Sequence, residues 1–240
     1  MKFKGPLIEA TLLKRSFHFL MEVVLKNRRR RTLYCPNLDP LANCDVLGSR
    51  LWFSTTNRLS QGYLDIVELM EVNGGWLVAV NPSYGPTLVA EALDRGTLPE
   101  LKGYRFVHFN SFQANHPTPI ELLLQEEGKH CFVTIEPVFF GDDKGDGYFP
   151  ETQTHSLSIL QELITQKERG HRAIVLYSVQ HNGIHCVRPR DSVHPAYGDL
   201  LRTAVAKGVE VIAYRTNINL TEIALESRIP VLLSEDILSD

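Results

Sequence analysis

Residues 120–138 read I-E-L-L-L-Q-E-E-G-K-H-C-F-V-T-I-E-P-V, and the interpretation of the chain depends on this stretch. Two apolar runs flank a polar turn that contains a glycine, and this pattern is typical of a β-hairpin. Side chains alternate along a strand, so Thr134 and Glu136 share one face of the second strand. Glu121 belongs to the first strand. The stretch therefore predicts that Glu121, Thr134 and Glu136 lie close together at the end of one sheet.

The composition is that of a globular protein with one large domain or two small ones. The chain has 240 residues, of which 43% are hydrophobic and 22% are charged. Glu9 interrupts the apolar residues near the start, and no apolar window approaches the roughly 18 residues of a membrane span, so neither a signal peptide nor a membrane partner is expected. The four cysteines form no C-x-x-C pair, which disfavours a zinc site and favours reduced thiols in the cytoplasm.

The charge is divided unevenly along the chain. The net charge is −3, yet residues 1–85 hold 11 Lys and Arg against 7 Asp and Glu, a net of +4. Residues 86–240 hold 14 against 21, a net of −7. The halves differ in sign, and such asymmetry is a mark of a half that binds a partner.

The first part is rich in short strands and poor in helix. Strands are predicted at 17–25, 32–35, 50–54, 65–72 and 75–80. A small β-barrel of the OB (oligonucleotide/oligosaccharide-binding) type is the leading interpretation, and barrels of that type commonly bind oligonucleotides. The fold alone does not establish the function.

A basic run, K-N-R-R-R-R at 26–31, lies between the first two predicted strands. Asn27 suits a turn, which places Lys26 and Arg28–Arg31 at or near a hairpin tip. Clustered arginine is the usual electrostatic signature of a phosphate-binding surface, so these five cations are predicted to bind nucleic acid. The alternative is a solvated turn without a partner.

The pattern changes after a linker rich in turn-forming residues at 81–86. Helices are predicted at 87–94, from Thr154 to 167 and at 196–206, and strands at 105–109, 173–179 and 209–214. Strands that alternate with helices indicate an α/β (α+β) second domain. The acidic loop at 141–149 resembles a calcium loop only superficially. His181 and His185 flank an Asn-Gly turn and so do not have the helical spacing of a metal-binding pair.

Several segments resemble the sugar fermentation stimulation protein A (SfsA) family. They share their order and spacing with that family, and they lie at 34–37 (Y-C-P-N), 51–54, 67–69, 76–81, 88–92, 99–104, 147–150, 160–163, 195–197 and 208–214. The resemblance implies an OB-like barrel domain over 1–85 and a restriction-endonuclease-like, PD-(D/E)xK-type α/β domain over 86–240. It also implies DNA binding, in which Asn37 of the C-P-N loop takes part, and a link to sugar metabolism in bacteria.

The chain departs from the family at the positions that would carry nuclease chemistry. The family's S-R-[IV]-D-F strand corresponds to T-P-I-E-L at 118–122, and its E-V-K-N strand corresponds to T-I-E-P at 134–137. A family T-E-R-G-Q segment corresponds to 154–158, and a basic K-R-K stretch to S-Q-G at 60–62. The family's C-P-N-T-G loop has Leu38-Asp39 in place of its last two residues. The scaffold positions match and the chemical positions do not.

These departures predict a site that no longer cleaves DNA, with Glu91, Glu121, Thr134 and Glu136 as its degenerate positions. Glu136 replaces a lysine where a cation must stabilise developing negative charge. We therefore expect a non-catalytic protein that binds DNA, with RNA as the alternative nucleic acid, and that needs no cofactor. The alternative is a residual nuclease that uses Mg²⁺ or Mn²⁺ on Glu121 and Glu136. A second alternative is a scaffold that binds a protein or a small ligand.

Overall fold

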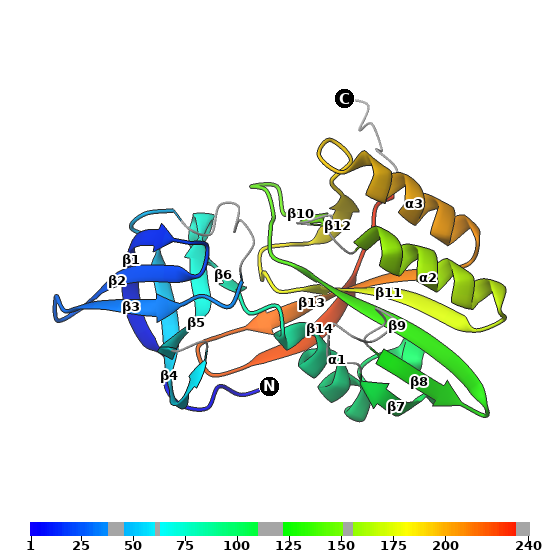
Figure 1. Ribbon diagram of the computed structural model, residues 1–240, viewed down its shortest axis with the longest axis horizontal. Coiled ribbons are helices and arrows are strands. Elements are labelled where there is room, and N and C mark those ends of the chain that lie inside the picture. Colours follow the sequence, from blue (N-terminus) through cyan, green and yellow to red (C-terminus); the bar gives the residue numbers. More distant parts are fainter. Residues whose placement is uncertain (38–45, 61–62, 110–121, 151–155, 234–240) are drawn as a thin grey trace.

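The computed structural model describes residues 1–37, 46–60, 63–109, 122–150 and 156–233 (Figure 1). The first five strands form a closed barrel; they are β1 (Ile8–Ser16), β2 (Leu20–Leu25), β3 (Arg30–Tyr34), β4 (Arg50–Ser60) and β5 (Tyr63–Val72). Antiparallel pairing runs in the order β3-β2-β1-β4-β5, and a parallel bridge from Tyr34 to Ile66 closes the ring. The expected five-stranded OB-type barrel is confirmed.

The strands that form the barrel are not all the ones that were predicted. β1 was not predicted, and Phe17 and His18, predicted as part of a strand, lie in the turn between β1 and β2. The last predicted strand is β6 (Trp76–Ala79), which follows a turn at Asn73–Gly75 and pairs with β5 outside the closed ring. Inward-facing Leu12, Met21 and Phe53 are among the residues that fill the barrel.

The second half forms a mixed six-stranded sheet. Its helices are α1 (Tyr84–Asp94), α2 (Ser156–Glu168) and α3 (Pro195–Ala206), and its strands are β7 (Arg105–Phe109), β8 (Leu122–Glu126), β9 (Lys129–Val138), β11 (Arg172–Val179), β13 (Glu210–Ile218) and β14 (Ile223–Ile229). The strand order is β14-β13-β11-β9-β8-β7, with β9, β11 and β13 parallel. A separate parallel pair joins β10 (Asp146–Phe149) to β12 (Cys186–Pro189). A short 3₁₀ helix, Pro99–Leu101, precedes β7.

The hairpin predicted from residues 120–138 is present as β8 and β9. Glu127 and Gly128 both have positive φ, as the two central residues of a type I′ turn require. Leu122 pairs with Val133 and Leu124 with Cys131, and all four side chains are buried. The turn therefore sets a register that sends apolar residues into the core.

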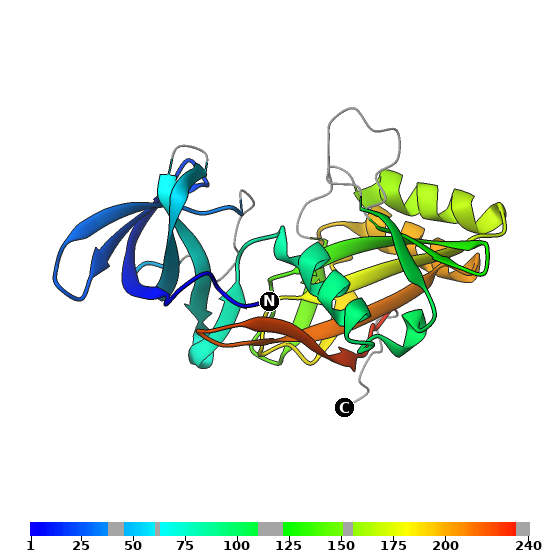
Figure 2. The same ribbon diagram turned by 90° about the horizontal axis from the view of Figure 1, so that it is seen from below.

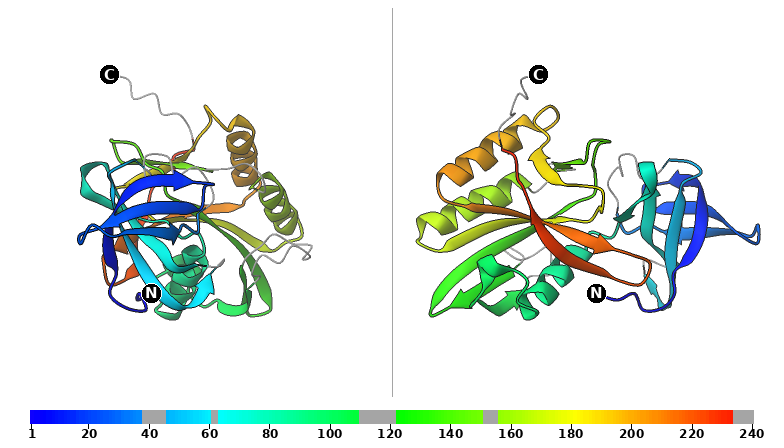
Figure 3. Two further views of the ribbon diagram at one scale, coloured as in Figure 1. Left: turned by 60° about the vertical axis from the view of Figure 1, so that its left-hand side comes forward. Right: turned by 180° about the vertical axis from the view of Figure 1, so that it is seen from behind.

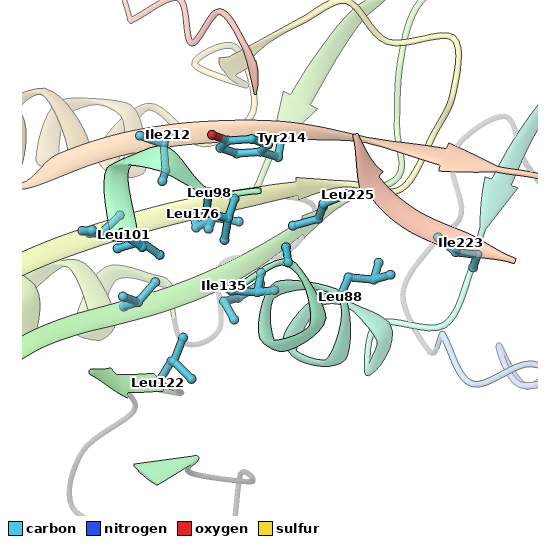
Figure 4. Close-up of a cluster of buried hydrophobic side chains, with 14 of the residues drawn as sticks. Leu88, Leu98, Leu101, Leu122, Ile135, Leu176, Ile212, Tyr214, Ile223 and Leu225 are labelled. Atoms are coloured by element: carbon cyan, nitrogen blue, oxygen red, sulfur yellow. The ribbon is translucent and has the colours of Figure 1, made fainter. Parts of the chain in front are cut away.

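Helices cover both faces of the second sheet. α1 packs on one face, against a core that includes Ile135, Leu176 and Ile212 (Figure 4). α2 and α3 cover the other face, where Val175 and Tyr177 of β11 are buried (Figure 3). β11 lies in the interior of the sheet and is buried along nearly its whole length, as its uniformly apolar sequence predicts.

The barrel and the second sheet lie at opposite ends of the long axis, with the N-terminus between them (Figure 2). Phe139, which follows β9, contributes to the hydrophobic core of the barrel, and a β-bridge joins Val78 of β6 to His181. The chain passes from β6 to α1 within the predicted linker region, and the division into domains at residue 85 stays a prediction about independent folding. Among the described residues, no helix is long and apolar enough to cross a membrane.

Candidate functional site

The basic run predicted from the sequence occupies the turn between β2 and β3, at the end of the barrel that points away from the second sheet (Figure 1). Arg28 adopts a positive φ of 64°, and its N–H donates to the carbonyl of Leu25 at 2.8 Å. The Asn27 side-chain oxygen accepts from the N–H of Arg29 at 3.1 Å. These local bonds hold the backbone of the turn and leave the arginine side chains in solvent.

The cations of this turn divide into two groups. The Lys26 ammonium lies 2.9 Å from the Glu9 carboxylate, and Arg31 lies 2.9 Å from Asp65. Arg28, Arg29 and Arg30 are exposed and have no ion pair in the part of the chain that the structure describes. Three arginines are therefore available to an anionic partner, fewer than the five cations that the sequence suggested.

Asn37 has a structural role in the described part of its loop. The residue is 2% exposed, and its main-chain carbonyl accepts a hydrogen bond from the Arg15 guanidinium at 2.9 Å. The same carbonyl lies 3.6 Å from the Cys35 thiol, which is a weak donor. Asn37 thus lies at the opposite end of β3 from the three exposed arginines, and Leu38 and Asp39 are outside the described residues.

Thr134 and Glu136 lie on the face of β9 that α2 and α3 cover. Thr134 is 1% exposed and pairs with Val175, whereas Glu136 is half-buried and pairs with Tyr177. The Tyr177 hydroxyl lies 2.7 Å from that of Tyr197 on α3. Burial raises the pKa of both tyrosines, and the nearby Glu136 carboxylate raises each of them further. Glu136 thus places a negative group beside two neutral phenols.

Glu91 and Glu121 are not placed beside these residues. Glu91 is on α1, on the opposite face of the sheet, and its carboxylate lies 2.6 Å from the Met1 ammonium and 3.4 Å from Arg95. The structure therefore separates Glu91 from Thr134 and Glu136, because an acid on the far face of a packed sheet cannot share a ligand with them. Glu121 lies outside the described residues, so its convergence with Thr134 and Glu136 stays a prediction.

No metal-binding group is found in the described ranges: no three His, Cys, Asp or Glu side chains lie together there as a metal site requires. His181 is 6% exposed, and its Nδ1 accepts from the N–H of Gly183 at 3.0 Å. Burial lowers the pKa of His181 to about 4. It is a neutral core histidine, and it does not form a pair with the exposed His185.

Sequence reasoning missed two features. The Tyr84 hydroxyl of α1 donates to the buried Glu68 carboxylate of β5, which also accepts from Ser54, so a polar group joins the two halves. Phe17 is largely exposed in a turn, although aromatic residues usually favour strands. In the sequence, Tyr84 cannot be distinguished from an ordinary core residue, and Phe17 cannot be distinguished from an ordinary strand residue.

Comparisons with known proteins agree with the fold and with the family resemblance. Residues 83–222 match the sequence model of the "Sugar fermentation stimulation protein RE domain". A sugar fermentation stimulation protein homolog of Teredinibacter turnerae is 36% identical over 234 residues, covering 97% of this chain and 100% of the relative. A homolog of Shewanella sp. strain ANA-3 is 36% identical over 233 residues, covering 96% and 99%.

A solved structure of Pyrococcus furiosus SfsA, described as in complex with Ca²⁺, has the same fold. It superimposes with a TM-score of 0.84 over 97% of this chain and 98% of that protein, at 18% sequence identity. The family match over most of the second half and the full-length relatives lead to one conclusion. The chain belongs to the sugar fermentation stimulation protein (SfsA) family.

Proposed function

We propose that this protein binds DNA through the turn between β2 and β3 and that it does not hydrolyse it. The observation that carries the proposal is the presence of three exposed arginines, Arg28–Arg30, without ion-pair partners in the described part of the barrel. Arginines on a projecting turn make contact with phosphates without displacing any packed group. The first 85 residues also carry a net charge of +4, which attracts a polyanion.

The three arginines give the proposal a quantitative form. Each phosphate contact on duplex DNA contributes about −0.9 to the slope of log K against log salt, so three contacts predict a slope of roughly −2.7. Lys26 and Arg31 add little to this slope, because Glu9 and Asp65 already neutralise them. Phosphate contacts carry no sequence information, so we expect DNA of different sequences to bind alike.

The surroundings of Thr134 and Glu136 support the absence of cleavage. A Mg²⁺ site needs hard oxygen ligands, usually carboxylates, and open positions for water and phosphate. Thr134 offers a neutral hydroxyl and is nearly inaccessible, and Glu136 introduces a negative charge where the family has a lysine. Electrostatic stabilisers are each worth about 10²–10³ in rate, and a reversed charge opposes the reaction. We therefore propose that no cofactor is required, with a Mg²⁺- or Mn²⁺-dependent nuclease as the alternative.

The family's name connects it with sugar fermentation, and we propose a regulatory role in sugar metabolism in the cytoplasm. A protein that binds DNA without cutting it acts by covering the DNA, and this action needs no recognition of a particular sequence. The second alternative, a scaffold for a protein or small ligand, applies if neither DNA nor RNA binds.

One assay separates these possibilities. Highly purified protein is mixed with labelled single-stranded DNA, duplex DNA and RNA, with and without Mn²⁺, and both binding and cleavage are scored. We expect salt-dependent binding and intact DNA. Cleavage that requires Mn²⁺ and is abolished by Glu121→Ala would establish the nuclease, and the absence of all binding would favour the scaffold.

A further inference from the structure

An exposed aromatic residue lies in the turn between β1 and β2. Phe17 is 76% exposed, the most exposed large hydrophobic side chain among the described residues. Phe17 and His18 have φ values of 52° and 64°, which bulky residues rarely adopt. Backbone strain of this kind persists where the surroundings impose it, and it is concentrated at ligand-binding sites. The turn therefore presents Phe17 to solvent at a conformational cost.

Phe17 is the outer member of a row of rings. Its centroid lies 6.4 Å from that of Phe19, and Phe19 lies 6.4 Å from Tyr34 at the end of β3. Phe19 and Tyr34 are only partly buried. Tyr34 pairs with Leu20, at the start of β2. The row thus occupies one end of the β2–β3 ribbon, and the three exposed arginines occupy the other.

Hydrogen bonds fix the backbone beneath these rings. The Arg15 guanidinium donates to the carbonyl of His18 at 2.8 Å and to that of Asn37 at 2.9 Å. The N–H of Cys35 donates to the carbonyl of Phe19 at 2.8 Å. One arginine therefore joins the β1–β2 turn to the loop after β3, so that the rings project from a braced base.

We infer that Phe17, Phe19 and Tyr34 form a stacking platform for the unpaired bases of a single-stranded nucleic acid. The inference rests on the proposed function and names its substrate class. Proteins that bind single strands combine cations that follow the backbone with aromatic rings on which bases stack. The ribbon provides both, separated by the six residues of β2, or about 20 Å at a rise of roughly 3.3 Å per residue.

The charge of this region and the need for accessible base faces both favour a single-stranded nucleic acid as the ligand of the platform. The aromatic row lies on the half of the chain whose net charge is +4 and on the same ribbon as Arg28–Arg30, which favours a polyanion over an uncharged surface. In a duplex the base faces are covered by their neighbours. Only a single strand presents both phosphates to the arginines and base faces to Phe17.

The test compares Phe17→Ala with the wild-type protein in fluorescence anisotropy. The probes are labelled oligo-dT, the same oligomer with abasic sugars, and a duplex of the same length. Removing the Phe17 ring, on which one base would stack, is expected to weaken oligo-dT binding about five- to hundredfold. Binding of the duplex and of the abasic strand should not change, nor should the salt slope. Phe17→Trp should restore oligo-dT binding, and Phe106→Ala, at a 53% exposed phenylalanine on β7, is the matched control.

The outcomes separate the two proposals. If the wild-type protein binds none of the probes, the proposed function fails and the platform fails with it. If the protein binds DNA but Phe17→Ala has no effect on oligo-dT, only the platform is refuted. An equal loss on oligo-dT and on the abasic strand would also refute it, because base stacking would then not be involved. A urea unfolding curve establishes that Phe17→Ala remains folded.

Discussion

Two hairpins of this molecule have opposite surroundings. The β2–β3 hairpin turns through Arg28 at positive φ and presents three arginines to solvent. The β8–β9 hairpin turns through Glu127 and Gly128, and its second strand, β9, is packed between the core under α1 on one face and the core under α2 and α3 on the other. Surface charges tolerate change because water solvates them. A position inside a sheet depends on neighbours from several elements, so we expect a substitution there to cost more.

The largest expected effect tests how closed the second hairpin is. Thr134→Glu would restore the acid of the family's triplet at a position that is 1% exposed. A buried carboxylate without a partner typically costs about 3–5 kcal/mol, so we expect a large loss of stability in urea unfolding. Thr134→Val, which has nearly the same shape, should stay within about 1 kcal/mol of the wild type.

Adding Glu136→Lys to Thr134→Glu sharpens the test. The two side chains share one face of β9, so the lysine should recover part of the lost stability without producing DNA cleavage. Full wild-type stability of Thr134→Glu alone would contradict the closed site, because the new carboxylate would then have reached water or a cation.

Much of the fold could be predicted from local pattern. The helices α1 and α3, the buried strand β11 and the β8–β9 hairpin all lie where apolar periodicity places them. The strands β10 and β12 were not predicted, because each is four residues long and pairs with a partner some 40 positions away. β14 was missed because charged residues weaken its alternating pattern.

The candidate site was predicted only in part, for a similar reason. The basic run is visible in the sequence, but the neutralisation of Lys26 by Glu9 and of Arg31 by Asp65 depends on strands that meet only in the folded barrel. The spacing of Glu91 gave no indication that it lies on the far face of the sheet. Burial and pairing, which decide the chemistry, are tertiary properties.

The second prediction tests the exposed hairpin. Replacing Arg28, Arg29 and Arg30 with alanine should reduce the salt slope for duplex DNA by about 2.7 and weaken binding on the order of 10²-fold near 0.1 M salt. Arg31→Ala is the matched control, since Asp65 already pairs with that side chain. A titration at several salt concentrations gives both quantities. Single replacements of Arg28, Arg29 and Arg30 with alanine are compared with Arg31→Ala. If all four single variants weaken DNA binding equally, the ion pair with Asp65 does not distinguish Arg31 from the other three arginines.

The third prediction concerns the contact between the two regions. Tyr84→Phe removes a hydroxyl that donates to Glu68, a carboxylate that is 7% exposed. Leaving a buried acceptor with one donor fewer typically costs about 1–3 kcal/mol. We also expect faster proteolysis between β6 and α1. Tyr214→Phe loses a similar bond to Glu100 within the second half, so it should leave cleavage at that segment unchanged.

The smallest effect is a pH dependence at the same junction, where His181 bridges to Val78. Burial lowers the pKa of His181 to about 4, below its usual value near 6.5. Between these values the unfolded chain binds a proton that the folded chain does not, so stability falls as the pH falls below about 6.5. At pH 5.5 this loss is about 1.3 kcal/mol relative to pH 7.5. His181→Asn retains an acceptor for the N–H of Gly183 but has no titrating group, so its unfolding free energy should change less over this range.

His185→Asn, at an exposed neighbouring histidine, should follow the wild type. Urea unfolding at pH 7.5 and 5.5 measures the difference, and identical pH profiles for the wild type and His181→Asn would mean that the histidine is solvated and that the junction is more open than its burial indicates.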